Sequence, residues 1–351
     1  EIVGSNLRGD RGEYFTPRNV TKMVVEMISP KIGETVLDCC CGTGGFLVSA
    51  MTYIIKQIET TAENQLGKPK SKWDNHEQIR VREKISEVAN KNFFGFDLNN
   101  ALVKASKMNM VMNNDGSGNI YQLNSLESPH LWQEEFRKEL ESKLHLKAGK
   151  ITNHHSIGLF DIILTNPPFG KDIDINDLSV LEQYQIASGR KSVPPEQLFV
   201  ERCWQFLKPG GRMALVLPDS ILGNPNLGYI RKWIIKNAQI IASVDLDGDT
   251  FQPKNGTQTS ILVLRKKTNE ELKEIDYNYN IFMAIVDKVG HDQRGIPVYK
   301  RDLDGEVLYF SKQRTMTNGE VESFEEPELD DQTTEVPQVF HQWKQSEGLN
   351  W

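Results

Sequence analysis

Short apolar segments recur along the chain between residues 35 and 265, and stretches with helical periodicity separate them. Several of these segments are almost uniformly apolar, as expected of strands that are covered on both faces of a parallel sheet. The alternation predicts an α/β fold with a mainly parallel sheet. The predicted strands comprise residues 35–39, 92–97, 119–123, 160–165, 212–217, 240–246 and 260–265.

Four stretches between or before these strands have the spacing of amphipathic helices. In the first, residues 17–29, the apolar positions repeat at intervals of three and four residues. Thr16 is its predicted N-cap, and Pro17 is its predicted first helical residue. The other predicted helices comprise residues 46–58, 101–112 and 196–207.

Three polar regions lie outside this alternation. Residues 59–90 carry both signs of charge and are predicted to form a helix extension followed by an exposed loop. Residues 127–159 contain a charged helical stretch, and from residue 268 onward the composition becomes polar. The chain is therefore divided into segments 1–30, 31–267 and 268–351.

A glycine-rich turn follows the first predicted strand, with the sequence Asp38-Cys39-Cys40-Cys41-Gly42-Thr43-Gly44-Gly45-Phe46. Glycines let the backbone approach a ligand closely, and the helix that begins here offers free N–H groups. The turn is neither a GxGxxG motif nor a P-loop. It indicates a nucleoside cofactor without specifying which one, and a tight turn with no ligand is the alternative.

Asp97 ends the second predicted strand. In doubly wound folds an acidic residue at this place accepts hydrogen bonds from the ribose hydroxyls of a nucleoside. The alternative is that Asp97 is the N-cap of the helix over residues 101–112.

The third signal is Asn166-Pro167-Pro168-Phe169, which follows a buried strand directly. Two prolines stiffen the backbone, so the Asn166 amide oxygen and the Pro167 carbonyl could face one spot at the sheet edge. Two acceptors suit an exocyclic amino group with two N–H donors, and Phe169 offers a flat face for stacking a base. A strand-ending turn is the alternative.

With these motifs the chain resembles the S-adenosylmethionine-dependent N6-adenine DNA methyltransferases, and more closely the modification subunits of type I restriction-modification systems. The resemblance includes the segment from Arg11 to Arg18, which precedes the glycine turn, and covers about residues 8–265. It implies a doubly wound, mainly parallel, seven-stranded sheet of the methyltransferase type with a polar C-terminal extension. It further implies that residues 1–30 hold a cofactor-closing segment and the first helix, and that residues 31–267 form the catalytic domain.

The resemblance also implies the site residues and the reaction. A methyl group would pass from S-adenosylmethionine to the amino group of an adenine flipped out of a DNA duplex. The residues implied to catalyse this transfer are Asn166, Pro167, Pro168 and Phe169. The residues implied to bind the cofactor are Glu13, Tyr14, Phe15, Thr16, Asp38, Gly42, Thr43, Gly44, Gly45, Phe46, Asp97, Asn124, Ser125 and Leu126.

The chain departs from the family pattern at three places. Cys39 stands where the family usually has proline, and Asn124 stands where it often has aspartate. An asparagine can still accept a hydrogen bond from the cofactor's adenine amino group through its carbonyl oxygen. The family's N-terminal helical domain is missing, which suggests a fragment.

Alternative functions are RNA or protein-glutamine methylation, since such enzymes also use Asn-Pro-Pro-aromatic motifs, and a non-catalytic subunit that keeps only the fold. The resemblance implies three partners: double-stranded DNA, a DNA-specificity subunit and, where one exists, a restriction (nuclease) subunit. No segment of this chain is identified as a DNA-recognition domain.

Charge and cysteine content refine this interpretation. The 351 residues include 41 Lys and Arg against 48 Asp and Glu, a net charge of −7 that at first argues against a nucleic-acid partner. Residues 319–335 hold eight acidic residues and no basic one, so the rest of the chain carries +1. We expect this acidic run to be a solvated tail; the alternatives are that it screens the DNA site or meets a basic partner.

Four cysteines, three of them consecutive, give neither a metal-site spacing nor a disulfide framework. We therefore expect no metal and a reduced cytoplasmic setting. Because no stretch approaches the ~20 apolar residues of a membrane span, we also expect no membrane association.

Overall fold

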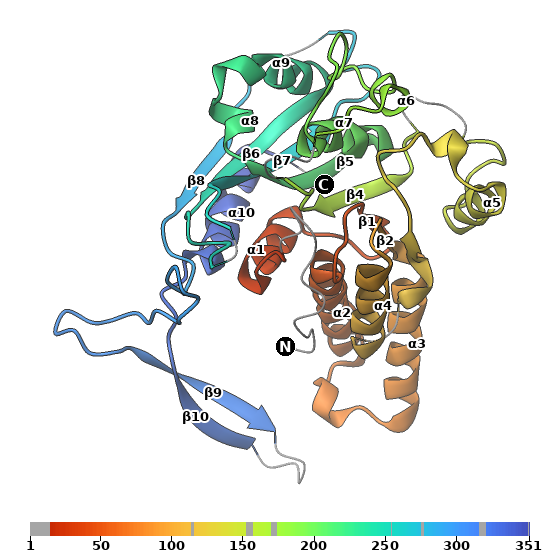
Figure 1. The fold of residues 1–351 in the computed structure, drawn as a ribbon. Helices are drawn as coiled ribbons and strands as arrows, with labels where there is room; N and C mark the ends of the chain where they lie inside the picture. The colour runs from red at the N-terminus through yellow and green to blue at the C-terminus, as the bar shows by residue number, and fades with distance from the viewer. Residues whose placement is uncertain are drawn as a thin grey trace.

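The computed structural model describes residues 15–113, 116–151, 157–169, 174–253, 255–274, 277–315, 321–349 and 351. Within these residues, one large sheet contains eight strands in the order β3-β2-β1-β4-β5-β7-β6-β8 (Figure 1). β7 is antiparallel to both of its neighbours, and the other pairs are parallel. The strands are β1 (Val36–Asp38), β2 (Phe93–Asp97), β3 (Ile120–Gln122), β4 (Phe160–Thr165), β5 (Leu207–Pro218), β6 (Ala238–Leu246), β7 (Thr259–Lys266) and β8 (Phe282–Val286).

The seven predicted strands correspond to β1–β7, which confirms the mainly parallel α/β sheet. The eighth strand, β8, lies in the polar segment 268–351 and adds an edge beside β6. It was missed because only its ends are buried, whereas Met283 and Ile285 are 71% and 69% exposed.

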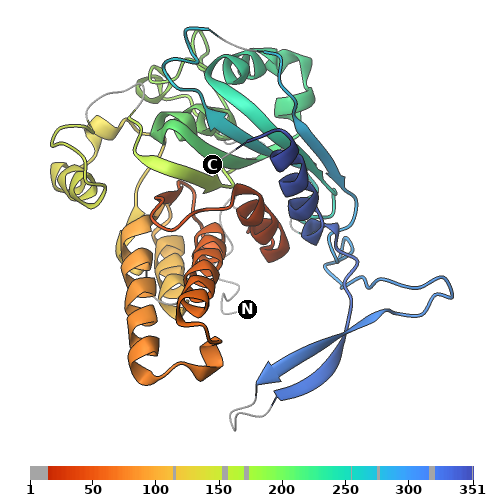
Figure 2. The ribbon, with the colours of Figure 1, turned by 180° about the vertical axis from the view of Figure 1, so that it is seen from behind.

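Helices cover both faces of the sheet, and each face has its own apolar core (Figures 1 and 2). Neighbouring strand residues alternate between the cores: Val36 and Ile162 belong to one, and Leu37 and Ile163 to the other. This alternation follows from the two-residue period of a strand. The first core is covered by α1 (Arg18–Ile28), α2 (Gly45–Leu66), α3 (Asn75–Asn92), α4 (Asn100–Met112) and α10 (Val336–Ser346), and the second by α5 (Glu134–Lys143), α6 (Leu178–Leu181), α7 (Pro195–Phe206), α8 (Ser220–Gly223) and α9 (Gly228–Asn237).

Two predictions about local structure are wrong. In residues 59–90 the predicted helix extension is confirmed, since α2 continues to Leu66, but most of the predicted loop is helix, because α3 begins after a capping box formed by Asp74 and Glu77. Thr16 does not cap α1, whose N-cap is Pro17. The Thr16 hydroxyl instead accepts a hydrogen bond from Nδ2 of Asn166, at 3.1 Å.

Two parts of the C-terminal segment, β8 and α10, pack against the rest of the molecule, and the part between them projects away from it. Besides β8, the helix α10 packs on α1, and Asn19 donates a hydrogen bond to the Asp331 carboxylate at 3.0 Å. Between β8 and α10, residues 288–315 and 321–331 belong to an arm that projects from the body and contains the antiparallel pair of β9 (Tyr309–Thr315) and β10 (Val321–Pro327) (Figure 2).

The acidic run is not a free tail, since it includes β10, and several of its acidic residues pair with cations of the arm while remaining at least partly exposed. Glu322 pairs with Arg314 and Glu326 with Lys312 across the hairpin. Glu328 pairs with Lys300, and Asp330 with Lys288. The division at residues 30 and 267 remains a prediction. None of the helices in the described ranges has the length and apolar character needed to cross a membrane.

Candidate active site

The carboxyl ends of three adjacent strands meet at one edge of the sheet. β1 lies between β2 and β4, so the turns after these strands are neighbours. A cavity of about 490 Å³ opens there, and a smaller one of about 50 Å³ adjoins it, since Phe15, Gly42 and Asn166 line both. The first volume is within the range of small-ligand sites.

Most of the predicted site residues line these two cavities. The larger one is lined by Phe15, Gly42, Asp97, Asn124, Ser125, Leu126, Asn166 and Pro168. The smaller one adds Thr16, Asp38, Thr43, Gly45 and Phe46. Gly44, Pro167 and Phe169 belong to neither lining, and Glu13 and Tyr14 lie outside the described residues.

Asp38 links the glycine turn to the strand that precedes Asn166. Its carboxylate accepts hydrogen bonds from the Thr165 hydroxyl at 2.7 Å and from the Cys40 N–H at 3.1 Å. The side chain is buried, and this burial raises its pKa well above the usual range, an effect to which Cys39 adds. Asp38 is therefore placed to fix the relative positions of two site loops.

The glycine turn uses backbone conformations that other residues rarely adopt. Gly42 and Gly44 have φ angles of +51° and +84°. A Cβ on Gly44 would lie 2.6 Å from Oγ of Ser106, so α4 packs directly against the turn. A Cβ on Gly42 would meet no protein atom within 4 Å, and Gly42 lines both cavities. The turn thus exposes backbone to the cavity.

Asp97 is held in place by two backbone N–H groups. Its carboxylate accepts hydrogen bonds from Gly42 and Asn99, both at 2.8 Å. Burial raises its pKa, and the two N–H groups oppose this shift. Asn99, rather than Asp97, is the N-cap of α4, so the alternative interpretation of Asp97 as the cap is not what the structure shows.

The loop after β3 forms another wall. Ser125 donates a hydrogen bond to the Cys39 carbonyl at 2.7 Å. The Asn124 amide closes a local turn: its oxygen accepts from the Leu126 N–H at 3.1 Å, and its nitrogen donates to Glu127 at 3.2 Å. Arg202 of α7, fully buried, donates to the Leu126 carbonyl at 3.0 Å and so ties this wall to the opposite side of the cavity.

Asn166 lies at the end of β4 and faces both cavities. Its Nδ2 donates to Thr16, which sets the orientation of the amide relative to the segment before α1. Of the residues that follow Asn166, only some face a cavity. Pro168 lines the larger cavity, whereas the Phe169 ring is 1% exposed and packs edge-to-face on Phe251, with centroids 6.3 Å apart.

Two groups of lining residues were missed by sequence reasoning. Leu98, Leu102 and Leu123 give the cavity an apolar wall next to Asp97. Asp174, Ile175, Asn176 and Asp177 line it from the segment that follows β4, and Pro195 and Phe199 from the start of α7. Leu98 directly follows Asp97, and residues 174–177 come shortly after Phe169, whereas Leu102 and Leu123 carry no local signal. Pro195 and Phe199 belong to a segment that the family resemblance includes, but they were not assigned to the site.

The donor set fits an adenosine-containing cofactor. Asp97 offers carboxylate oxygens for ribose hydroxyls, the leucines offer an apolar wall for a base, and Gly42 leaves room for close approach. Among the described residues, no group of three His, Cys, Asp or Glu side chains is arranged to hold a metal ion.

Comparison with known proteins identifies relatives of this chain. The type I restriction enzyme EcoEI methylase subunit of Escherichia coli is 27% identical over 265 residues, which is 74% of this chain and 43% of that protein. The EcoKI methylase subunit of Escherichia coli K12 is 24% identical over 258 residues, 73% of this chain and 41% of that protein. The chain thus spans less than half the length of these curated relatives, and the resemblance inferred from the motifs is confirmed.

Solved structures share the fold. A chain from a study of the assembly of the type I R-M system superposes with a TM-score of 0.51 at 24% identity, covering 73% of this chain and 42% of that one. A nuclease-deletion mutant of the Type ISP restriction-modification enzyme LlaGI, in complex with a DNA substrate mimic, gives a TM-score of 0.55 at 16% identity, covering 87% of this chain and 30% of that one.

A family model described as N-6 DNA Methylase matches residues 3–289, most of the chain. The chain therefore belongs to the N-6 DNA methylase family.

Proposed function

We propose that this chain transfers a methyl group from S-adenosylmethionine to the N6 amino group of an adenine in DNA, as the modification subunit of a type I restriction-modification complex. The observation that carries the proposal is that Asp97 and Asn166 line one cavity of about 490 Å³. A carboxylate suited to ribose and an amide suited to an exocyclic amino group thereby face the same space.

The cofactor would lie between the glycine turn and the wall formed by Asn124, Ser125 and Leu126. When bound, S-adenosylmethionine would supply an electrophilic methyl group on its sulfonium. Asp97 would accept hydrogen bonds from the ribose, and Gly42 would permit close approach of the backbone. The closing segment, with Phe15 and Thr16, would exclude water from the methionine end.

The amino group of adenine is a poor nucleophile, because its lone pair is delocalised into the ring. Hydrogen bonds from its two N–H groups to the Asn166 amide oxygen and the Pro167 carbonyl would favour a pyramidal nitrogen. The same acceptors would stabilise the positive charge that develops there. Alignment of the nitrogen with the methyl group would supply much of the remaining acceleration.

Cysteine chemistry does not compete with this direct transfer. Cys40 lines the larger cavity, but burial, together with the neighbouring Cys39, raises its pKa well above the usual range. A thiol with a raised pKa remains protonated and is a weak nucleophile. Cys39 also lines this cavity, and hydrogen bonding to Cys203 lowers the pKa of its thiol despite burial, but the side chain is 1% exposed and its Sγ lies 3.4 Å from Sγ of Cys203. The direct transfer proposed here requires no cysteine.

The target adenine must leave the duplex to reach this cavity, and unstacking costs a few kcal/mol. Phe169 is the residue proposed to stack on the flipped base. Because its ring packs on Phe251 in this structure, that role requires the ring to move when a base enters. The proposal includes DNA, a DNA-specificity subunit and, where one exists, a restriction subunit as partners, in a cytoplasmic setting.

The test is incubation of the chain with labelled S-adenosylmethionine and with DNA, RNA or protein in separate reactions, with and without a co-purified specificity subunit. Label recovered as N6-methyladenine in DNA supports the proposal. Label recovered only in RNA or on glutamine side chains would contradict it. Cofactor binding without transfer to any of the three would identify a non-catalytic subunit.

A further inference from the structure

Five cations, two in the segment before α7 and three in α9, are not explained by methyl transfer itself. We propose that Arg190, Lys191, Arg231, Lys232 and Lys236, here called the basic face, bind phosphates of the DNA duplex that carries the target adenine. The inference rests on the proposed function for the identity of the substrate. It adds which surface of this chain holds the duplex.

The local sequence is strongly biased toward positive charge. Residues 220–240 contain three basic residues and no acidic one, and Arg190-Lys191 has no acidic neighbour within four residues on either side. This bias contrasts with the arm, residues 288–331, which holds eleven acidic and six basic residues. A duplex favours the first surface and is repelled by the second.

The Arg190 side chain packs on Tyr229, a residue of the first turn of α9. Its guanidinium lies 3.6 Å from the centroid of the Tyr229 ring, and the Tyr229 hydroxyl donates to Gln197 of α7 at 2.7 Å. Stacking on an aromatic ring orients a guanidinium while leaving its N–H donors available for a phosphate. Arg190 is thus exposed to solvent, and its guanidinium is oriented by the Tyr229 ring.

The lysines of α9 continue from this point along the same side of the helix. Lys232 and Lys236 follow Tyr229 by three and seven residues, a spacing that places side chains on one helix face. With a rise of about 1.5 Å per residue, the two lysines are about 6 Å apart along the helix axis. Both side chains are exposed. Arg231 supports the preceding loop by donating to the carbonyls of Ile221 and Asn224, each at 2.9 Å.

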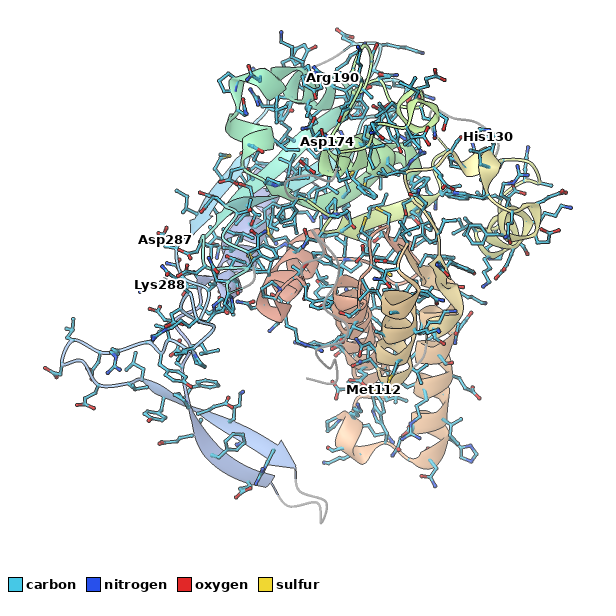
Figure 3. All side chains as sticks on the ribbon, viewed as in Figure 1. Met112, His130, Asp174, Arg190, Asp287 and Lys288 are labelled. Carbon is cyan, nitrogen blue, oxygen red and sulfur yellow. The ribbon has the colours of Figure 1, made fainter. Side chains whose placement is uncertain are left out.

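The basic face is connected to the cavity through short contacts. Ser192, two residues after Arg190, donates to the Asp174 carboxylate at 2.6 Å, and Asp174 lines the cavity. The strand-like bridge between Ile175 and Val193 holds the same two segments together. Figure 3 shows Asp174 and Arg190 near α7 and α9, well away from Asp287 and Lys288 at the base of the arm.

These cations are also available. Over the described ranges, no ion pair joins Arg190, Lys191 or a cation of α9 to a carboxylate. Elsewhere on the surface, Lys84 and Lys91 both pair with Glu87, and Lys138 pairs with Glu134. Unpaired cations can release condensed counterions from DNA when they meet phosphates, and paired ones contribute less.

The test compares two triple variants of the full chain. In the first, Arg190→Gln, Lys232→Gln and Lys236→Gln remove three cations of the basic face. In the control, Lys84→Gln, Lys91→Gln and Lys138→Gln remove the same charge from α3 and α5. Affinity for a fluorescent DNA duplex is measured by anisotropy at several salt concentrations. We expect the slope of log affinity against log salt to fall by about 2 to 3 in the first variant and to stay at the wild-type value in the control.

Two further measurements separate this inference from the proposed function. Calorimetry of S-adenosylmethionine should give the same affinity for both variants, and the KM for DNA in methyl transfer should rise at least tenfold in the first variant alone. An unchanged salt slope in the first variant would contradict phosphate binding by the basic face, even if the variant still transfers methyl groups. Loss of assembly with a specificity subunit at an unchanged slope would identify a protein interface instead and would also overturn it. If the wild type transfers no methyl group, the proposed function is contradicted. The salt dependence of DNA affinity in the two variants would still test whether the basic face binds phosphates.

Discussion

The carboxyl edge of the sheet and the C-terminal arm use polar residues in opposite ways. At the edge, Asp38 and Asp97 are bound by backbone N–H groups or a buried hydroxyl, at distances of 2.7–3.1 Å. In the arm, acidic residues such as Glu322 pair with flexible, exposed cations. The first arrangement holds a carboxylate in one position, whereas the second joins exposed side chains across two antiparallel strands.

The difference shows where substitutions should matter. Buried polar groups whose partners are removed destabilise a protein strongly, and exposed ion pairs contribute between about 0 and 1 kcal/mol. The edge should therefore tolerate few changes and the arm many, although both regions are rich in charged residues.

The largest expected effect is on methyl transfer at Asn166. Asn166→Ala removes the proposed amide acceptor, and we expect the transfer rate to fall about a hundredfold to a thousandfold or below detection. Cofactor affinity, measured by calorimetry, should remain close to that of the wild type. Asn226→Ala, at an exposed position between α8 and α9, is the matched control. Undiminished transfer of label to adenine in the Asn166 variant would show that the mechanism is wrong.

A substitution in the glycine turn should weaken cofactor binding. Gly44→Asp places a Cβ 2.6 Å from Ser106 Oγ at a φ of +84°, so the turn must shift. We expect the affinity for S-adenosylmethionine to fall at least about tenfold, equivalent to 1.4 kcal/mol. Gly33→Asp has the same backbone strain at φ +97° in open space, away from the cavity. Equal cofactor affinities in the two variants would contradict the proposed role of the turn.

Two Arg–Glu pairs test the contrast in stability directly. Arg212 is 3% exposed and donates to both oxygens of Glu34 and to the carbonyls of Ile28 and Ser29. Arg314, which pairs with Glu322 in the arm, is 61% exposed. In urea unfolding, Arg212→Met should lower the free energy of unfolding by about 3 to 5 kcal/mol. Arg314→Met should lower it by less than about 1 kcal/mol. If both variants lost a similar free energy of unfolding, burial would not explain the different importance of the two ion pairs.

The last prediction concerns the pH dependence of stability and a buried acid beside the cavity. Glu196 is 8% exposed, and burial raises its pKa to about 7. The folded state therefore holds a proton that the unfolded state releases above pH 4.5, so this group's contribution to stability falls as the pH rises toward 7 and is constant above. Glu196→Gln should remove that fall and stabilise the protein at pH 8, relative to pH 5, by about 2 to 3 kcal/mol. Glu135→Gln, at an exposed site in the first turn of α5, should change nothing.

Much of the fold could be predicted from the sequence because buried strands and amphipathic helices have distinct periods. The seven strands from Val36 to Lys266 were predicted within a few residues, apart from β5, which begins earlier. β8 was not, because an edge strand with exposed Met283 and Ile285 lacks the apolar pattern of a buried one. The arm was missed because cross-strand ion pairs such as Glu322–Arg314 join residues that only the fold brings together.

The site shows the same limit. Motifs at strand ends indicated Asp97 and Asn166, since carboxyl ends of neighbouring parallel strands share one edge. Leu98 and Asp174 carry no motif and enter the cavity only through the path of their loops. The contact of Thr16 with Asn166 joins residues 150 positions apart and could not be read from local sequence.

The central claim is that this edge of the sheet methylates adenine in DNA, and nucleoside analysis of the reaction product tests it most directly. Duplex DNA is incubated with the chain, its specificity subunit and labelled S-adenosylmethionine, then digested to nucleosides and separated. We expect label in N6-methyl-2′-deoxyadenosine from the wild-type chain and none from Asn166→Ala. Label at another base, or equal label at adenine from both chains, would contradict it.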